Sequence, residues 1–284
     1  ANLVEDDYIN QIFIATTHSY ITFITNEGKA YWVKVHEIPE ASRGSRGSHI
    51  KSLLAVSANE EITTIVTMKE FNADLNIFMA TANGVVKKTP ITEFANAKTR
   101  GVIAIKLEEG DKLVSSIMTS GKDELMLVTR RGQALRITEE DVRPMGRSSR
   151  GVTGIRLSGG DELSAALCVK PNMNALVITE KGFGKRVDFN EYSAHGRGTG
   201  GQKIFGNVED KGEIIGALSV ADSDEVVCMT SQGKTLRIQA DTISKQGRSA
   251  SGTRVINIES PDYVVGIDRV AKEDEKNAEK SEEK

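Results

Sequence analysis

The sequence predicts an all-β protein built as a propeller-like ring of blades, and two observations carry this prediction. One phrase, best seen at residues 129–151, occurs five times, each time opening with Thr-x-x-Gly and closing on a Gly-ended basic turn. The opening glycines are separated by 56, 48, 50 and 51 residues, a period that is typical of repeat architectures. About four short alternating strands fit each period, which favours closed or radial β-structure. The opening glycines are Gly28, Gly84, Gly132, Gly182 and Gly233.

The front half of each repeat reads as a hairpin. Residues 20–34 alternate in hydrophobicity on both sides of Gly28, and a tight turn there needs a residue that tolerates φ > 0. Short segments after the hairpin, such as 138–142 and 239–243, predict single helical turns. A second strand pair with an acidic turn then follows each closing glycine, as at 101–119.

The ends of the chain set the expected domain limits. Residues 1–16 align with the back half of a repeat, and the front half that would precede them is not in the sequence. Five front halves and six back halves predict a six-bladed ring with part of one blade missing. We expect one β-domain over residues 1–271, starting mid-blade, and a disordered, charged tail over 272–284.

Composition indicates a cytoplasmic protein that binds no membrane. Of 284 residues 38% are hydrophobic, and the apolar runs are strand-sized, so none predicts a membrane span. The first ten residues lack the pattern of a secretory signal. Cys168 and Cys228 lie within apolar runs and are expected to be reduced.

The sign of the charge depends on the position within each repeat. The five windows from opening to closing glycine hold 19 Lys and Arg against nine Asp and Glu, a net +10, whereas the whole chain carries −3. Such segregation can create a basic surface on an acidic protein, as phosphate binding requires.

Two positions in each repeat carry this positive charge. The first is the fourth residue after the opening glycine, which we expect on the solvent side of its strand; edge protection is the alternative interpretation of its charge. In the first repeat Trp32 occupies this position, and the charge is displaced by two residues. The candidate phosphate-binding residues on these strands, with two lysines beside them, are Lys34, Lys87, Lys88, Arg136, Lys185, Arg186 and Arg237.

The second position is the closing turn, in which small residues separate basic ones. Small residues let a backbone approach a ligand closely, and arginine forks match phosphate oxygens. The alternative is a solvated loop without a ligand. No pattern of base-reading residues recurs with the turns, so we expect nucleic-acid binding that is independent of sequence. The candidate residues are Arg43, Arg46, Lys98, Arg100, Arg147, Arg150, Arg197 and Arg248.

Signatures of catalysis, metal binding and cofactor binding are missing from the sequence. The four histidines occupy different repeat phases, and none pairs with a Cys or His at metal-ligand spacing. Residues 196–201 look like a dinucleotide loop but lack the strand–turn–helix context. We therefore expect no catalytic residue, no metal and no cofactor.

Segments 31–43, 78–94 and 196–201, set in these repeats, resemble the C-terminal domain of the DNA gyrase A subunit. The resemblance implies a six-bladed β-pinwheel with strands exchanged between blades, and a basic rim that bends and wraps duplex DNA. It further implies that the domain partners the catalytic core of its own polypeptide, through which it joins the ATPase subunit in an A2B2 assembly. ATP-driven strand passage then yields negative supercoils.

One feature of that family is not matched. The basic, Gly-rich gyrase A box has only loose relatives here, in residues 42–48 and 196–202. The alternatives are a box upstream of Ala1 or the related topoisomerase IV subunit, which selects substrates for decatenation. A propeller-like module that binds an acidic protein partner is the third possibility.

Overall fold

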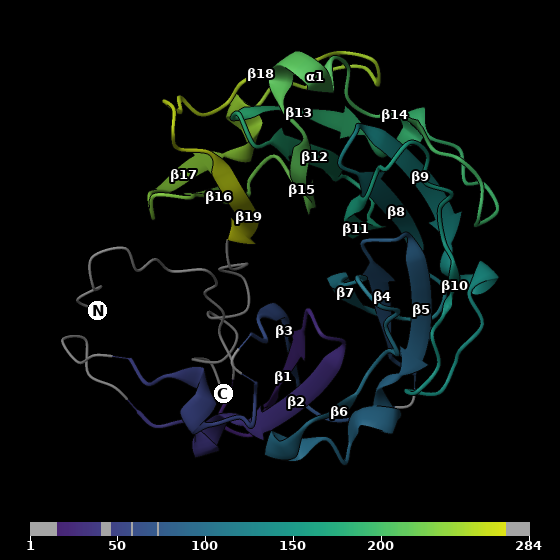
Figure 1. Ribbon diagram of the computed structural model, residues 1–284, viewed down its shortest axis with the longest axis vertical. Helices are drawn as coiled ribbons and strands as arrows, with labels where there is room; N and C mark the ends of the chain where they lie inside the picture. Colours follow the sequence, from purple (N-terminus) through teal and green to yellow (C-terminus); the bar gives the residue numbers. More distant parts are fainter. Residues whose placement is uncertain (1–15, 41–46, 58, 73, 271–284) are drawn as a thin grey trace, which may run out of the picture.

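A computed structural model describes residues 16–40, 47–57, 59–72 and 74–270. Five antiparallel sheets follow one another around an arc in sequence order (Figure 1). In the first sheet, β1 (Tyr20–Thr25) and β2 (Lys29–Lys34) form the opening hairpin. On the inner side β3 (Ile62–Met68) pairs with β1, and on the outer side β6 (Val102–Ile103) pairs with β2.

The other sheets repeat this order. The second contains β7 (Leu113–Thr119), β4 (Asn76–Thr81), β5 (Val85–Pro90) and β10 (Val152–Thr153). The third contains β11 (Leu163–Val169), β8 (Glu124–Thr129), β9 (Gln133–Thr138) and β14 (Gln202–Lys203). The fourth contains β15 (Ile214–Val220), β12 (Asn174–Thr179), β13 (Phe183–Asp188) and β18 (Thr253–Arg254). The fifth contains β19 (Val264–Val270), β16 (Glu225–Thr230) and β17 (Thr235–Gln239).

Neighbouring blades are tied together by exchanged strands. The outer strand of each four-stranded sheet comes from the following repeat, so β6 completes the first sheet although it follows β5 in the chain. The exchange that the resemblance implied is therefore present, and it joins each blade covalently to the edge of its neighbour.

Short helical turns connect the strands. Those after the hairpins include the predicted turns, η5 and η7, so the expectation for 138–142 and 239–243 is confirmed. The turns are η1 (Val35–Glu37), η2 (Ile50–Ser52), η3 (Ile91–Phe94), η4 (Lys98–Arg100), η5 (Glu139–Asp141), η6 (Phe189–Glu191) and η7 (Ala240–Thr242), with one α-helical turn, α1 (Val208–Lys211).

The hydrophobic core lies between neighbouring blades. One cluster joins Phe78 and Val86 of the second sheet to Leu125, Leu127 and Leu135 of the third, and all five side chains are at most 1% exposed. Both faces of an inner blade are thus covered by its neighbours. Charged residues on its strands are therefore buried unless they lie at an edge. Cys168 and Cys228 are buried and free, as expected.

The prediction of six blades is wrong, because the structure describes five. Each blade is built on one opening hairpin, and the sequence holds five such hairpins. The extra back half counted at 1–16 falls almost wholly outside the described residues, as do the start of the predicted domain and its tail at 272–284. The fifth sheet has three strands, since no further repeat follows β19 in the described part of the chain.

Candidate nucleic-acid interface

The closing loops, which we define as residues 98–101, 147–151, 197–201 and 248–252, lie along the outer edge of the preceding sheet. Gly151 shows how close they come, because a Cβ atom built on it would lie 2.6 Å from the carbonyl oxygen of Val86 in β5. The predicted residues Arg43 and Arg46 fall outside the described residues. The basic side chains exposed on the four loops are those of Lys98, Arg100, Arg150, Arg197 and Arg248.

Three closing loops begin with an arginine that follows a glycine in a tight turn. The amide of Ser149 donates to the carbonyl of Gly146 over 3.2 Å, and Ala250 donates to Gly247 over the same distance. In the loop between them the hydroxyl of Thr199 donates to Gly196 over 3.0 Å. The arginine after each glycine is therefore presented from an ordered turn rather than from an irregular loop.

Three loop arginines already have partners on the protein surface, whereas Arg147 is half-buried and its Nε has no hydrogen-bond partner in the described part of the chain. Arg150 pairs with Glu108 over 2.8 Å, but both side chains are more than 60% exposed, so water screens this pair. Arg197 donates to the carbonyl of Asp141 over 3.0 Å, and Arg248 donates to the Gln202 side chain over 2.7 Å. A guanidinium has five N–H donors, so each arginine keeps donors for a further ligand.

The fourth residue after the opening glycine is not on the solvent side, contrary to prediction. Lys88 and Arg186 are 4% exposed, and the Arg136 side chain is 15% exposed. The cause is the stacking of blades, because each of these side chains donates to carbonyl groups in or beside the helical turn of the next blade. The nearest of these carbonyl groups are those of Glu139 for Lys88 (3.0 Å), Phe189 for Arg136 (2.9 Å) and Ile243 for Arg186 (2.7 Å).

The same position in the first and fifth repeats supports this assignment. Trp32 donates its ring N–H to the carbonyl of Phe94 over 3.1 Å, so the contact with the next blade does not need a charge. Arg237 has no following blade in the described chain, and its side chain is 56% exposed, beside Glu225 at 3.6 Å. Lys34, two residues beyond Trp32, is half-buried, with its ammonium 5.8 Å from the centre of the Tyr20 ring.

Lys87 and Lys185 are also buried, and the ammonium of each contacts backbone carbonyls of a closing loop. Each is 0% exposed, and burial lowers the pKa of each ammonium from 10.5 to about 8. Lys87 donates to the carbonyls of Arg147, Ala104 (2.7 Å) and Ser149 (3.2 Å). The ammonium of Lys185 lies between the carbonyls of Gly247 (2.6 Å) and Arg248 (2.9 Å).

Four exposed basic residues beside the loops were missed at the sequence level. They lie two or five residues beyond a closing glycine, in or after the outer strand, and this fixed offset could have identified them. The amides of two of them donate to the next closing loop, to Ser149 over 3.1 Å and to Thr199 over 2.9 Å. The four residues are Lys106, Arg156, Lys203 and Arg254.

The acidic turns lie beside the opening hairpin turns. Asp111 and Asp161 each accept a hydrogen bond of 3.0 Å from the amide of an opening-turn residue, Asn83 and Arg131 respectively. Asp262 accepts from Gln232 over 3.1 Å in the same way. These three aspartates are therefore fixed at the hairpin turns, whereas Glu108, in the same acidic turn as Asp111, pairs with Arg150 of a closing loop.

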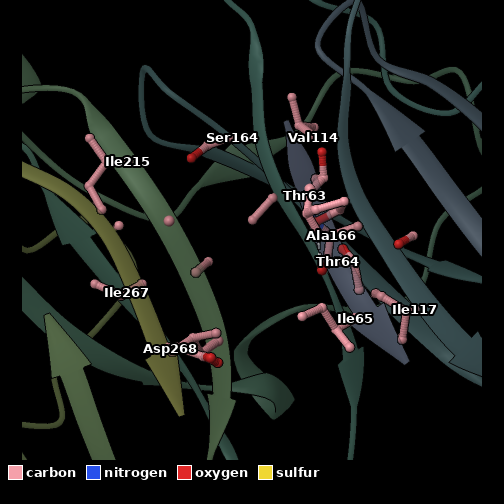
Figure 2. A pocket seen from close by; sticks show the side chains of 18 of the residues that line it. Thr63, Thr64, Ile65, Val114, Ile117, Ser164, Ala166, Ile215, Ile267 and Asp268 are labelled. Atoms are coloured by element: carbon pink, nitrogen blue, oxygen red, sulfur yellow. Dashed lines mark hydrogen bonds between the residues drawn. The ribbon is translucent and has the colours of Figure 1, made fainter. Parts of the chain in front are cut away.

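A cavity of about 680 Å³ lies among the inner strands β3, β7, β11, β15 and β19 (Figure 2). Isoleucine, threonine and serine side chains line it, together with Asp268. Burial raises the pKa of the Asp268 carboxyl.

Among the described residues no group of three or more His, Cys, Asp or Glu could hold a metal ion. No helix in that part of the chain is long and apolar enough to cross a membrane.

Exchanged-strand blades around a common axis, with basic loops at one repeat phase, define a propeller-like repeat domain with a basic outer edge. Five segments match the family described as the DNA gyrase C-terminal domain, a β-propeller, at residues 19–67, 75–120, 123–170, 174–221 and 224–271. The chain belongs to this family.

Individual relatives agree with this assignment. The chain is 60% identical to the DNA gyrase A subunit of Treponema pallidum and 39% identical to that of Salmonella typhimurium, over 94% and 95% of its length. It spans 33% and 31% of those two proteins.

Two solved structures share the fold. A DNA gyrase A C-terminal domain has a TM-score of 0.79 and 29% identity, covering 90% of this chain and 84% of that one. A DNA topoisomerase IV C-terminal domain has a TM-score of 0.85 and 25% identity, covering 94% and 85% respectively.

Proposed function

We propose that this domain binds duplex DNA along its closing loops, bends it and wraps it, as the accessory domain of the A subunit of a DNA gyrase. Its partners are the catalytic core of the same polypeptide and, through that core, the ATPase subunit in an A2B2 assembly. Wrapping then directs ATP-dependent negative supercoiling by the core, in the cytoplasm at the nucleoid. The observation that carries this proposal is the exposed basic side chain on the closing loop of four consecutive repeats.

The proposed contacts are with the DNA backbone. Arginine forks donate to phosphate oxygens in pairs, and lysines supply point charges. The contact set consists of the exposed basic residues of the closing loops, the half-buried Arg147 and the exposed basic residues beyond the closing glycines. It leaves out Lys87, Lys88, Arg136, Lys185 and Arg186, whose donors bind protein carbonyls. Backbone contacts carry no base information, so affinity should vary little with sequence.

Contacts on several blades at once offset the cost of bending. Bending about 20–30 bp by about 40–90° costs on the order of 1–6 kcal/mol. Each neutralised phosphate releases counterions and contributes about −0.9 to the log–log slope of affinity against salt. Loops at successive positions along the arc favour a curved path for the DNA over a straight one.

The C-terminal domain of a topoisomerase IV is the second candidate, favoured by the TM-score of 0.85 to such a domain. Identity of 60% to a gyrase protein supports gyrase more strongly. An assay of the full-length protein with its ATPase partner separates the two, because only gyrase introduces negative supercoils into relaxed plasmid.

The test of DNA binding removes Arg147 and Arg150 together by substitution with alanine. We expect duplex affinity to fall about tenfold, and the salt slope to become shallower by about 1.8, the value for two lost phosphate contacts. A mobility shift between about 50 and about 200 mM salt measures both quantities.

The matched control is Arg130→Ala with Arg131→Ala, which removes the same charge from the opening turn of the same repeat. This control should retain the wild-type slope, and both variants should unfold near the wild-type midpoint. The proposal would be contradicted if the wild-type affinity did not depend on salt concentration, or if the variant lacking Arg147 and Arg150 bound DNA normally. Either result would favour a module that binds an acidic protein.

A further inference from the structure

The two buried lysines occupy a position where the fold does not require lysine. Lys87 and Lys185 are each the third residue after an opening glycine, and the equivalent residues in the other repeats are Tyr31, Leu135 and Leu236. Burying an ammonium is strongly destabilising unless the ammonium is well hydrogen-bonded. The lysines therefore need a reason specific to their two repeats.

The closing loops that the two lysines contact supply this reason. Both loops start within the sequence Gly-Arg-Ser, at 146–148 and 247–249, and both turns have the same hydrogen bond. Lys87 binds the carbonyls of Arg147 and Ser149, and Lys185 binds those of Gly247 and Arg248. Each ammonium thus fixes two peptide groups of its loop.

Fixing the carbonyls also fixes the amides. The C=O and the following N–H of a trans peptide point in opposite directions, so a carbonyl turned inward leaves the next N–H turned outward. This applies to the N–H groups of Ser148, Arg150 and Ser249, for which no acceptor exists within the described chain. Outward amides beside an arginine form a concavity suited to an anion.

We propose that Lys87 and Lys185 are positioning residues for phosphate binding, which hold the backbone amides and the arginine of loops 147–151 and 248–252 toward the DNA. Neither lysine touches DNA itself. The inference rests on the proposed function of the loops and adds the part played by two charges hidden beneath them.

The protonation state of Lys87 makes the proposed role testable by a pH dependence of DNA affinity. An ammonium has three N–H donors for the three carbonyls around Lys87, whereas a neutral amine has two. Burial and the nearby Arg147 lower the pKa of Lys87 to about 8, and Glu93 opposes them. Lys185, near Glu191, has only two carbonyls and keeps both bonds when neutral. Raising the pH through 8 should therefore weaken the 147–151 loop most.

As the pH rises through 8, the free energy of unfolding should change in the opposite direction to the DNA affinity. The pKa of Lys87 is about 8 in the folded protein and 10.5 for the unperturbed group, so the unfolded state holds more protons between these values. This lysine's contribution to the free energy of unfolding therefore rises as the pH increases from about 8 to about 10.5. A residue that only supported the fold would make affinity and stability rise together.

The test compares Lys87→Met and Lys185→Met with Lys112→Met, which removes an exposed lysine from an acidic turn. We expect each buried substitution to weaken binding of a duplex about tenfold and to make the salt slope shallower by at least about 0.9. The Lys112 variant should bind DNA within about twofold of wild type. Circular dichroism and urea unfolding verify that the variants are folded.

A second measurement uses the unmodified protein. Its duplex affinity, measured at constant salt from about pH 7 to about pH 9.5, should fall through pH 8 while the unfolding midpoint does not fall. Full affinity in folded Lys87→Met, or wild-type affinity that is flat across this range, overturns the inference while leaving DNA binding intact. Failure of the wild-type protein to bind duplex at any pH overturns the proposed function instead.

Discussion

At the scale of single residues, Arg186 and Arg237 show that one repeat position can have two environments. Arg186 donates to the carbonyls of Ile243 and Asp241 in the fifth blade and to the carboxylate of Asp222. Arg237, one repeat later, is 56% exposed. The difference is the presence of a following blade, so neighbouring structure decides whether this arginine joins blades or faces water.

Arg186→Met should therefore destabilise the domain by about 2–4 kcal/mol, because buried carbonyls lose their donor. Arg237→Met is the matched control and should change stability by less than about 0.5 kcal/mol, as expected for an exposed site. Urea unfolding followed by circular dichroism measures both values. Equal effects of the two substitutions would refute the assigned contact between blades.

The sequence could predict the loop residues but not the buried basic ones. Strand alternation tells which residues share a face, and it cannot tell that a neighbouring blade covers that face. Lys88 and Arg186 were therefore predicted on the solvent side, whereas the carbonyl groups that they bind lie more than 50 positions away in the chain. The closing loops were predictable because small residues and charge recur there at a fixed offset.

At the scale of elements, the opening turn is also the joint between blades. The carbonyl of Gly132 accepts from Ile204 over 2.8 Å and from Phe205 over 3.3 Å, where the exchanged strand leaves the sheet. The hairpin itself was predicted from alternation and from the glycine. The strand pair predicted at 101–119 contains β6 and β7, but these strands join different sheets. The residues did not indicate this exchange, because β6, β10, β14 and β18 have two residues each and no period of their own.

Gly132→Ala tests this joint. Its φ is +83°, and an added Cβ would lie 2.7 Å from the carbonyl oxygen of Phe205. Strain and overpacking together should cost about 2–4 kcal/mol. Gly110→Ala has a similar φ of +80° but open space around the added Cβ, so it should cost only about 1–2 kcal/mol. Thermal unfolding of the two variants would contradict this account if Gly110→Ala were the more damaging.

At the scale of the whole molecule, repetition turns a weak local feature into a surface. The net charge of −3 gives no hint of nucleic-acid binding, yet the exposed basic side chains recur on the outer loops of consecutive blades. The acidic turns are fixed against the opening hairpins. An arc of such loops (Figure 1) favours a ligand that is long, regularly charged and able to bend.

This arrangement predicts how affinity depends on DNA length. A duplex of about 10 bp meets few loops, and one of about 40 bp can follow several, so the salt slope should steepen with length by about 0.9 for each added phosphate contact. It should then reach a plateau, once the DNA covers the arc. Longer duplexes must also bend, so end-to-end energy transfer should increase on binding only for them. A slope that is the same at every length, with no change in energy transfer, would place all contacts on one loop and rule out a rim that bends DNA.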